Sequence, residues 1–230
     1  MSRPNRLDEL RALLRQRSVA VRSSQATRDG CQLWPPGGLA SGEVSEWIAD
    51  QHGSGAAVLA LATVRRQLAD DSHCLVIDPW GEVSPVALEQ MGWNLSRVVF
   101  ARAQEPAEVL WTVEQGLGSR GVELVFCRLS KLPAVAFRRL KLAAETGGSR
   151  CVLIRQPEAL RETSWADVRL LVSPLPSPCW RRRRLRVDVL KIRNGLPGGA
   201  VQLELNNETG HVRVVSELAH SADHRRAAGA

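Results

Sequence analysis

Short runs of apolar, often branched residues recur along the middle of the chain, separated by longer segments of helical periodicity. The pattern of the short runs is typical of buried strands. They occupy residues 44–48, 74–77, 98–100, 124–127, 151–154 and 170–172. The helix-length segments are 56–68, 85–91, 106–117 and 133–145, and the last three begin with proline, a residue favoured in the first turn. This alternation predicts βαβ units and a mainly parallel sheet with helices on both faces.

The pattern changes after Ser173. Pro174, Pro176 and Pro178 follow at alternate positions, and we expect them to break the chain. Residues 185–192 and 201–205 then alternate apolar and polar side chains, residues 212–215 are β-branched, and glycine-rich turns lie at 194–199 and 208–210. These features predict an antiparallel meander that extends the sheet.

The first 30 residues differ from the rest. Leucines at helical spacing predict a short amphipathic helix, which either docks on its own domain or binds a partner: Leu7, Leu10, Leu13 and Leu14. A polar stretch from Arg22 to Gly30 then resembles a linker. We therefore expect a helix and linker at 1–30, one globular core at 31–218 and a disordered tail at 219–230.

Composition narrows the class of protein. The 230 residues are 44% hydrophobic, which fits a globular chain. No apolar stretch is long enough for a membrane helix, and the N-terminus lacks a signal-peptide core, so the expected location is the cytoplasm.

The net charge of +7 is concentrated at two places. Residues 1–30 carry seven arginines against three acids, and residues 180–196 carry seven basic groups against Asp188 alone.

Cysteine and tryptophan add little chemistry. The five cysteines form no C-x-x-C pair, so we expect buried thiols and no metal site. Seven tryptophans are many for one domain, and Trp47 and Trp111 lie on apolar faces that predict a core position.

A strand, a glycine-containing turn and a helix follow one another at residues 44–68, which is the setting of a phosphate-binding loop. The turn and the first helical residues are Asp50, Gln51, His52, Gly53, Ser54, Gly55, Ala56 and Ala57. A working loop needs a lysine for the phosphates and a hydroxyl for Mg²⁺, and alanines stand at both positions. Asp50, where the first glycine belongs, would repel phosphate. The motif is therefore degenerate, and a plain tight turn remains an alternative.

The order of these segments resembles the RecA-like recombinase core. The similar stretches are 46–61 around the loop, 73–85 with Asp78 and Pro85, 122–130 as the Walker B strand, 151–156 ending in Gln156, and 189–199. The resemblance implies a three-layer α/β/α core with a mainly parallel sheet and a C-terminal antiparallel meander.

The departures from the RecA-like pattern remove its chemistry. The catalytic glutamate position falls on Trp80, and the Walker B aspartate position falls on Arg128, or on Cys127 if the register slips by one. Gln156, which senses nucleotide state in the family, remains. Together with Ala56 and Ala57, these changes remove phosphate charge pairing, Mg²⁺ binding and water activation. The resemblance therefore implies a protein without catalytic residues or cofactor; ATP with Mg²⁺ is the alternative.

A RecA-like core without its chemistry, between a basic helix and an arginine-rich meander, is most similar to the ImuA family. The resemblance implies an adaptor in SOS-response DNA repair and translesion synthesis. Its partners would be a Y-family polymerase-like protein of the ImuB type and an accessory DNA polymerase. Alternatives are a DNA-dependent ATPase or recombinase-like protein with a degenerate loop, a DNA-binding module without a dedicated polymerase partner, and a cell-division inhibitor of the SulA type.

The sharpest local feature is a tryptophan followed by a run of arginines: Trp180, Arg181, Arg182, Arg183, Arg184 and Arg186. Such a run could contact single-stranded DNA, with the indole available for stacking. It could equally contact a protein partner or form a solvated surface. On a strand, alternate arginines point to opposite faces, so they cannot easily serve one groove.

Overall fold

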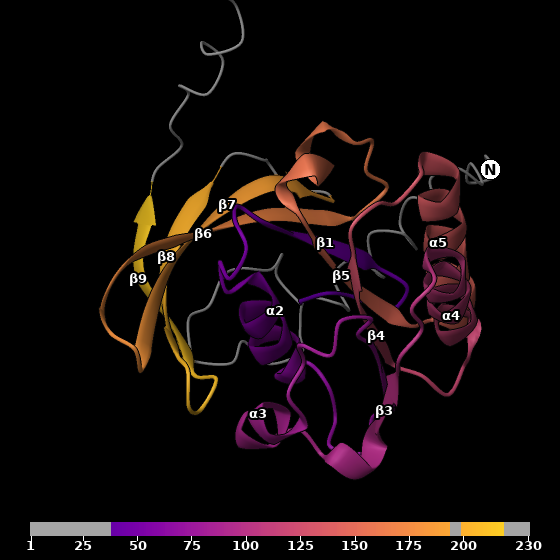
Figure 1. The fold of residues 1–230 in the computed structure, drawn as a ribbon, viewed down its shortest axis with the longest axis horizontal. Helices are drawn as coiled ribbons and strands as arrows, with labels where there is room; N and C mark the ends of the chain where they lie inside the picture. The colour runs from indigo at the N-terminus through magenta and orange to yellow at the C-terminus, as the bar shows by residue number, and fades with distance from the viewer. Residues whose placement is uncertain (1–37, 194–198, 219–230) are drawn as a thin grey trace, which may run out of the picture.

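The computed structural model describes residues 38–193 and 199–218, and these form one nine-stranded sheet (Figure 1). The strand order is β3-β2-β4-β5-β1-β6-β7-β8-β9. The first six of these strands are parallel, and β6 to β9 are antiparallel. The strands are β1 Val44–Ala49, β2 Cys74–Ile77, β3 Val98–Ala101, β4 Leu124–Leu129, β5 Arg150–Arg155, β6 Val168–Cys179, β7 Arg182–Ile192, β8 Ala200–Asn206 and β9 Val212–Leu218. The predicted α/β fold with C-terminal antiparallel strands is confirmed.

Helices cover both faces of the parallel part. The elements are α2 Ala56–Arg65, α3 Pro85–Gln90, α4 Pro106–Gly118 and α5 Ala134–Gly147, with 3₁₀ turns η2 at Leu95–Arg97 and η3 at Pro157–Arg161. Helices α4 and α5 lie side by side on one face, and α2 lies on the other (Figure 1). Pro106 lies in the first turn of α4 as predicted, whereas Pro133 is the N-cap residue that precedes α5.

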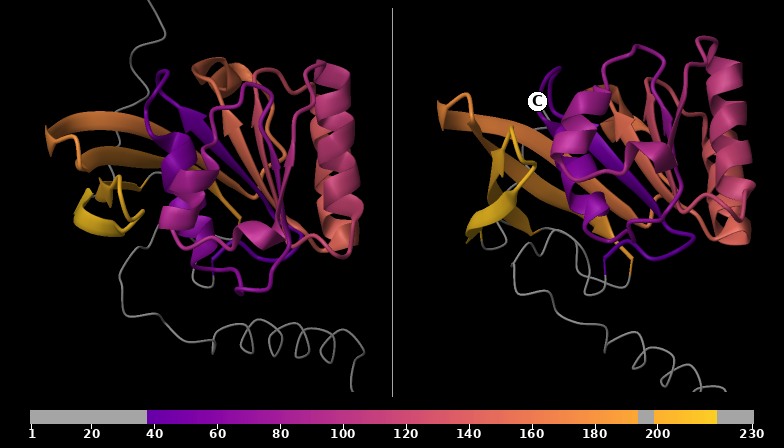
Figure 2. Two further views of the ribbon diagram at one scale, coloured as in Figure 1. Left: turned by 60° about the horizontal axis from the view of Figure 1, so that its bottom comes forward. Right: turned by 90° about the horizontal axis from the view of Figure 1, so that it is seen from below.

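The two faces have separate hydrophobic cores. One core packs α4 and α5 against β2, β4 and β5. The other surrounds α2 and includes residues of the antiparallel strands, among them Leu185, Leu203 and Val212. Figure 2 shows the reason, because the antiparallel strands curve around α2 and hold it between themselves and the parallel strands. The meander is therefore part of the main core.

The three prolines do not break the chain as we expected, because β6 runs through all of them to Cys179. β1 ends at Ala49, opposite Val172, so beyond this point β6 has a partner only in β7. Alternate residues of a strand address the same edge, so prolines at every second position can turn their missing N–H groups away from β7.

The predicted leucine helix at residues 7–14, most of the turn at 194–199 and the tail from residue 219 lie outside the described residues. Within the described part, no helix has both the length and the hydropathy needed to cross a membrane.

Candidate functional site

The loop between β1 and α2 has the expected strand–turn–helix geometry. Ser54 donates its backbone N–H to the Gln51 carbonyl at 3.1 Å, and its buried hydroxyl accepts from the Ala56 N–H at 3.4 Å. Gly53 and Gly55 have φ values of 74° and 92°, which side chains other than glycine rarely adopt. Asp50 and His52 are exposed. The backbone of the loop therefore places the start of α2 at the carboxyl edge of the sheet, which is where open α/β sheets bind ligands.

The start of α2 carries no side chain that could pair with phosphate or Mg²⁺. Ala56 is buried against the hydrophobic core around α2, and Ala57 is partly buried beside it. A methyl group supplies neither charge nor hydroxyl. The first turn of α2 therefore adds packing to the fold and no chemistry to the loop.

An arginine that sequence reasoning assigned to the basic run lies against this loop instead. The Arg183 Nη1 atom on β7 donates to the Gly53 carbonyl at 3.4 Å. A Cβ placed on Gly55 would lie 3.0 Å from the same Nη1 atom and 3.1 Å from the arginine Cδ. Glycine at this position thus leaves room for Arg183, which the curved meander brings to the mouth of the loop. Only the inward direction of alternate β7 residues could have indicated this contact.

The neighbouring strand ends carry an ion pair where a hydrolysing site needs acids. Arg128 on β4 places Nη1 2.5 Å from the Glu82 carboxylate, which follows β2. Its guanidinium also lies over the Trp80 ring, 5.7 Å from the centroid. Trp80 is half exposed, so it covers the arginine from the solvent side. The guanidinium therefore places a positive charge at this edge of the sheet, paired with the Glu82 carboxylate.

Two further polar residues lie at this edge. Asp78 is buried, and its Oδ2 accepts from the Val83 N–H at 2.6 Å, whereas Oδ1 is buried without a hydrogen-bond partner among the described residues. Gln156 follows β5, next to β1, and is the N-cap residue that precedes η3. In the part of the chain described here, no three His, Cys, Asp or Glu side chains lie close enough together to hold a metal ion.

A buried charge network lies on the opposite face of β1, and sequence reasoning missed it. Glu46 is 1% exposed and pairs with Arg155 on β5 at 2.9 Å and with Arg169 on β6 at 2.7 Å. Arg155 also pairs with Glu162, and Arg169 donates to the Ala159 carbonyl. These contacts fasten η3 and the segment after it to the sheet. In the sequence, the only sign of this network was that charged residues stand at inward-facing positions of three neighbouring strands.

The arginine run does not form one basic patch. Arg183 points inward to the loop, while Arg182, Arg184 and Arg186 alternate with it on β7 and face outward. Arg184 lies 3.6 Å from Glu204, and Arg186 pairs with Asp188. The hydrogen bond to Asp188 is the main cause that raises the pKa of Arg186 further above its ordinary value. The prediction that the run divides between two faces is confirmed.

The thiols and tryptophans follow the predictions only in part. Cys74, Cys127 and Cys151 are buried, but Cys179 at the end of β6 is exposed, contrary to expectation. Burial raises the pKa of the Cys74 thiol to about 12 and also raises those of Cys127 and Cys151. Trp47 is fully buried as predicted.

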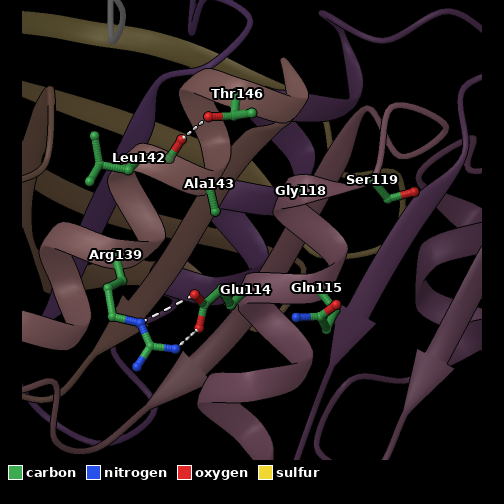
Figure 3. Close-up of a pocket in the computed structure, with 8 residues that line it drawn as sticks. All are labelled: Glu114, Gln115, Gly118, Ser119, Arg139, Leu142, Ala143 and Thr146. Atoms are coloured by element: carbon green, nitrogen blue, oxygen red, sulfur yellow. Dashed lines mark hydrogen bonds and ion pairs between the residues drawn. The ribbon is translucent and has the colours of Figure 1, made fainter.

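The prediction for Trp111 is wrong, because its side chain on α4 is 62% exposed. Along α4 it precedes by one turn Glu114 and Gln115, which line a shallow groove between α4 and α5; Figure 3 shows the residues that line this groove. Glu114 and Arg139 bridge this groove with an ion pair, and Leu142 is an exposed apolar side chain on its α5 side. Trp111 therefore lies outside the buried stripe of α4, which consists of Val109, Val113, Gly116 and Leu117.

Comparison with known proteins decides the family. No family model matches the sequence. The chain is 30% identical to Protein ImuA of Caulobacter vibrioides strain NA1000 / CB15N over an alignment 232 positions long, which covers 87% of this chain and 89% of that protein. The chain belongs to the ImuA family. Protein ImuA of Caulobacter vibrioides strain ATCC 19089 / CIP 103742 / CB 15 matches to the same extent.

Proposed function

We propose that this ImuA-family chain is a non-hydrolysing, cytoplasmic RecA-like adaptor in the DNA-damage mutagenesis pathway. It would bind a Y-family polymerase-like protein of the ImuB type and an accessory DNA polymerase. The observation that carries the proposal is the Arg128–Glu82 ion pair under Trp80. It stands where metal-bound nucleotide would need carboxylates, while Ala56 and Ala57 leave the loop without lysine or hydroxyl.

An adaptor of this kind uses the RecA-like core as a rigid platform. In this proposal the Arg128–Glu82 ion pair and the alanine at position 56 offer no groups for metal-bound nucleotide, so partner binding would not depend on ATP. Binding energy would then come from protein surfaces, among them the predicted amphipathic helix with Leu7, Leu10, Leu13 and Leu14.

The test is a titration of the full chain with Mg²⁺-ATP by calorimetry, next to complex formation with the polymerase-like protein of the same organism. We expect no heat of binding at micromolar ATP and no phosphate release with or without single-stranded DNA. The partner complex should form equally with no nucleotide, ADP or ATP. Deletion of residues 1–30 should weaken it. Micromolar ATP binding, or a complex that requires ATP, would overturn the proposal.

A second candidate, a DNA-dependent ATPase with an unusual loop, is favoured by the position of Arg183. Its guanidinium lies at the loop, where it could supply the positive charge that Ala56 lacks. If that candidate holds, ATP binds to the unmodified chain and Arg183→Ala abolishes the binding. The matched control is Arg182→Ala, which removes the same charge from the outward face of the same strand.

A further inference from the structure

The turn between β6 and β7 presents an exposed tryptophan on a braced backbone. Cys179 pairs with Arg182 across this turn, so Trp180 and Arg181 form its tip. The side-chain amide of Asn207 donates to the Trp180 carbonyl, and the Asn207 N–H donates to the Arg181 carbonyl at 2.9 Å. The turn between β8 and β9 therefore supports the tip from the side, and Trp180 is held on a fixed backbone.

The Trp180 ring has no part in the core. Its side chain is 70% exposed, and the Arg181 guanidinium lies over the ring, 5.3 Å from its centroid. Arg181 is itself held by Glu208 at 3.3 Å. A cation on one face of an indole leaves the other face free for a flat partner.

Guanidinium groups continue from this tip along the outer face of the antiparallel strands. Leu185, Leu203 and Leu205 point into the core around α2, so the residues that alternate with them face outward. This outer face carries Arg182, Arg184, Arg186 and Arg213 against Asp188 and Glu204. Positive charge is thus in excess, and none of the described helices covers this face (Figure 2).

The one outward arginine without a partner is nearest to the tryptophan. Among the described residues, no hydrogen bond or ion pair holds the exposed Arg182 side chain. Arg184 shares Glu204 with Arg213, so that carboxylate cannot neutralise both. Successive outward arginines on β7 are about 6.6 Å apart, which is comparable with the separation of phosphates along an extended nucleic acid strand.

We propose that this surface, defined by Trp180, Arg182 and Arg184, binds single-stranded DNA. A base stacks on the free face of Trp180, and the backbone runs along β7 so that its phosphates meet the outward arginines. A single strand is favoured over a duplex because only unpaired bases expose a face to one isolated tryptophan. The proposal goes beyond the adaptor function and depends neither on ATP nor on a polymerase partner, so each can fail without the other.

The test is fluorescence anisotropy of a labelled oligothymidylate with the full chain across a salt series, compared with a blunt duplex of equal length. We expect tighter binding of the single strand and affinity that falls steeply with salt. Trp180→Ala should weaken binding about tenfold, and Trp180→Phe should restore most of it. Trp111→Ala, the control, removes another exposed tryptophan and should have no effect. Arg182→Ala should reduce the slope of log affinity against log salt by about 1, whereas Arg120→Ala, on an exposed loop, should leave that slope unchanged.

Three outcomes overturn the proposal. These are the absence of binding at low salt, binding that is the same in Trp180→Ala and in the unmodified chain, and equal affinity for the duplex. If no oligonucleotide binds while Trp180→Ala dissociates the polymerase-like partner, the surface is a protein interface instead. Circular dichroism melts of each variant separate a lost contact from a lost fold.

Discussion

The Arg128 guanidinium lies 2.5 Å from the Glu82 carboxylate, and this ion pair joins the carboxyl ends of β4 and β2. In RecA-like proteins of the active type, the resemblance assigns acidic groups to this edge. In this chain, Arg128 stands at the predicted position on β4, and Glu82 is its ion-pair partner. The structural role of the pair can be measured without reference to nucleotide.

The pair should stabilise the fold by a modest amount. Arg128 is mostly buried and Glu82 is partly exposed, so solvent screens the interaction. We expect a coupling energy of about 1 kcal/mol between Arg128→Met and Glu82→Gln in a double-mutant cycle from urea unfolding. A coupling energy near zero would mean that Trp80 and the strand ends hold Arg128 by themselves.

The buried charge network should contribute far more to stability. Glu46→Gln leaves Arg169 in the interior without a matching charge and Arg155 with Glu162 alone, and breaking such a buried pair costs about 3–5 kcal/mol. Asp70→Asn is the control, because it breaks the exposed pair with Arg65 and should cost less than about 1 kcal/mol. Equal effects of the two variants on the free energy of unfolding would contradict this assignment.

The alternation of strands and helices was predictable because each element carries its own hydrophobic period. The predicted strand at 74–77 coincides with β2, and the helix predicted at 85–91 differs from α3 by one residue. The hydrophobic pattern did not predict that β6 continues through Pro174. The strand can continue there because β1, its neighbour on one side, ends earlier than β6. The hydrophobic pattern also failed at Trp111, because an apolar residue on an amphipathic helix is buried only if a neighbour covers it.

The candidate site was predictable in its elements and not in its contacts. The sequence order placed the loop at Gly53–Gly55, Arg128 and Gln156 at one edge, because parallel strands carry their carboxyl ends there. Glu82 and Arg183 were not foreseen as its neighbours. Glu82 is placed by the loop after β2, and Arg183 by the curvature of the meander, and neither leaves a local pattern in the sequence.

Close packing of α4 and α5 should depend on one glycine. A Cβ on Gly147 would lie 2.0 Å from the Leu117 carbonyl oxygen, so Gly147→Ala must push the two helices apart. We expect a loss of about 1–3 kcal/mol in the free energy of unfolding. Gly118→Ala is the control, since nothing lies within 4 Å of its Cβ position and alanine favours helix. A neutral Gly147→Ala would show that the helices part without cost.

The buried thiols should make stability fall with pH on the alkaline side. Burial raises the pKa of Cys74 to about 12 from 9.0, and those of Cys127 and Cys151 also rise. Above pH 9 the unfolded chain loses these protons while the folded chain keeps them, so the free energy of unfolding decreases until the folded thiols ionise as well. Each thiol contributes a slope of about 1.4 kcal/mol per pH unit in this range.

Urea unfolding at a series of pH values from neutral to alkaline measures this slope. Cys74→Ala should reduce the slope of the free energy of unfolding against pH by the contribution of one thiol, whatever the variant does to stability at neutral pH. Cys179→Ala is the matched control, because Cys179 is exposed and its removal should leave the slope unchanged. The interpretation fails if the slope is the same in Cys74→Ala and in the unmodified chain, since water would then reach the β2 thiol in the folded state.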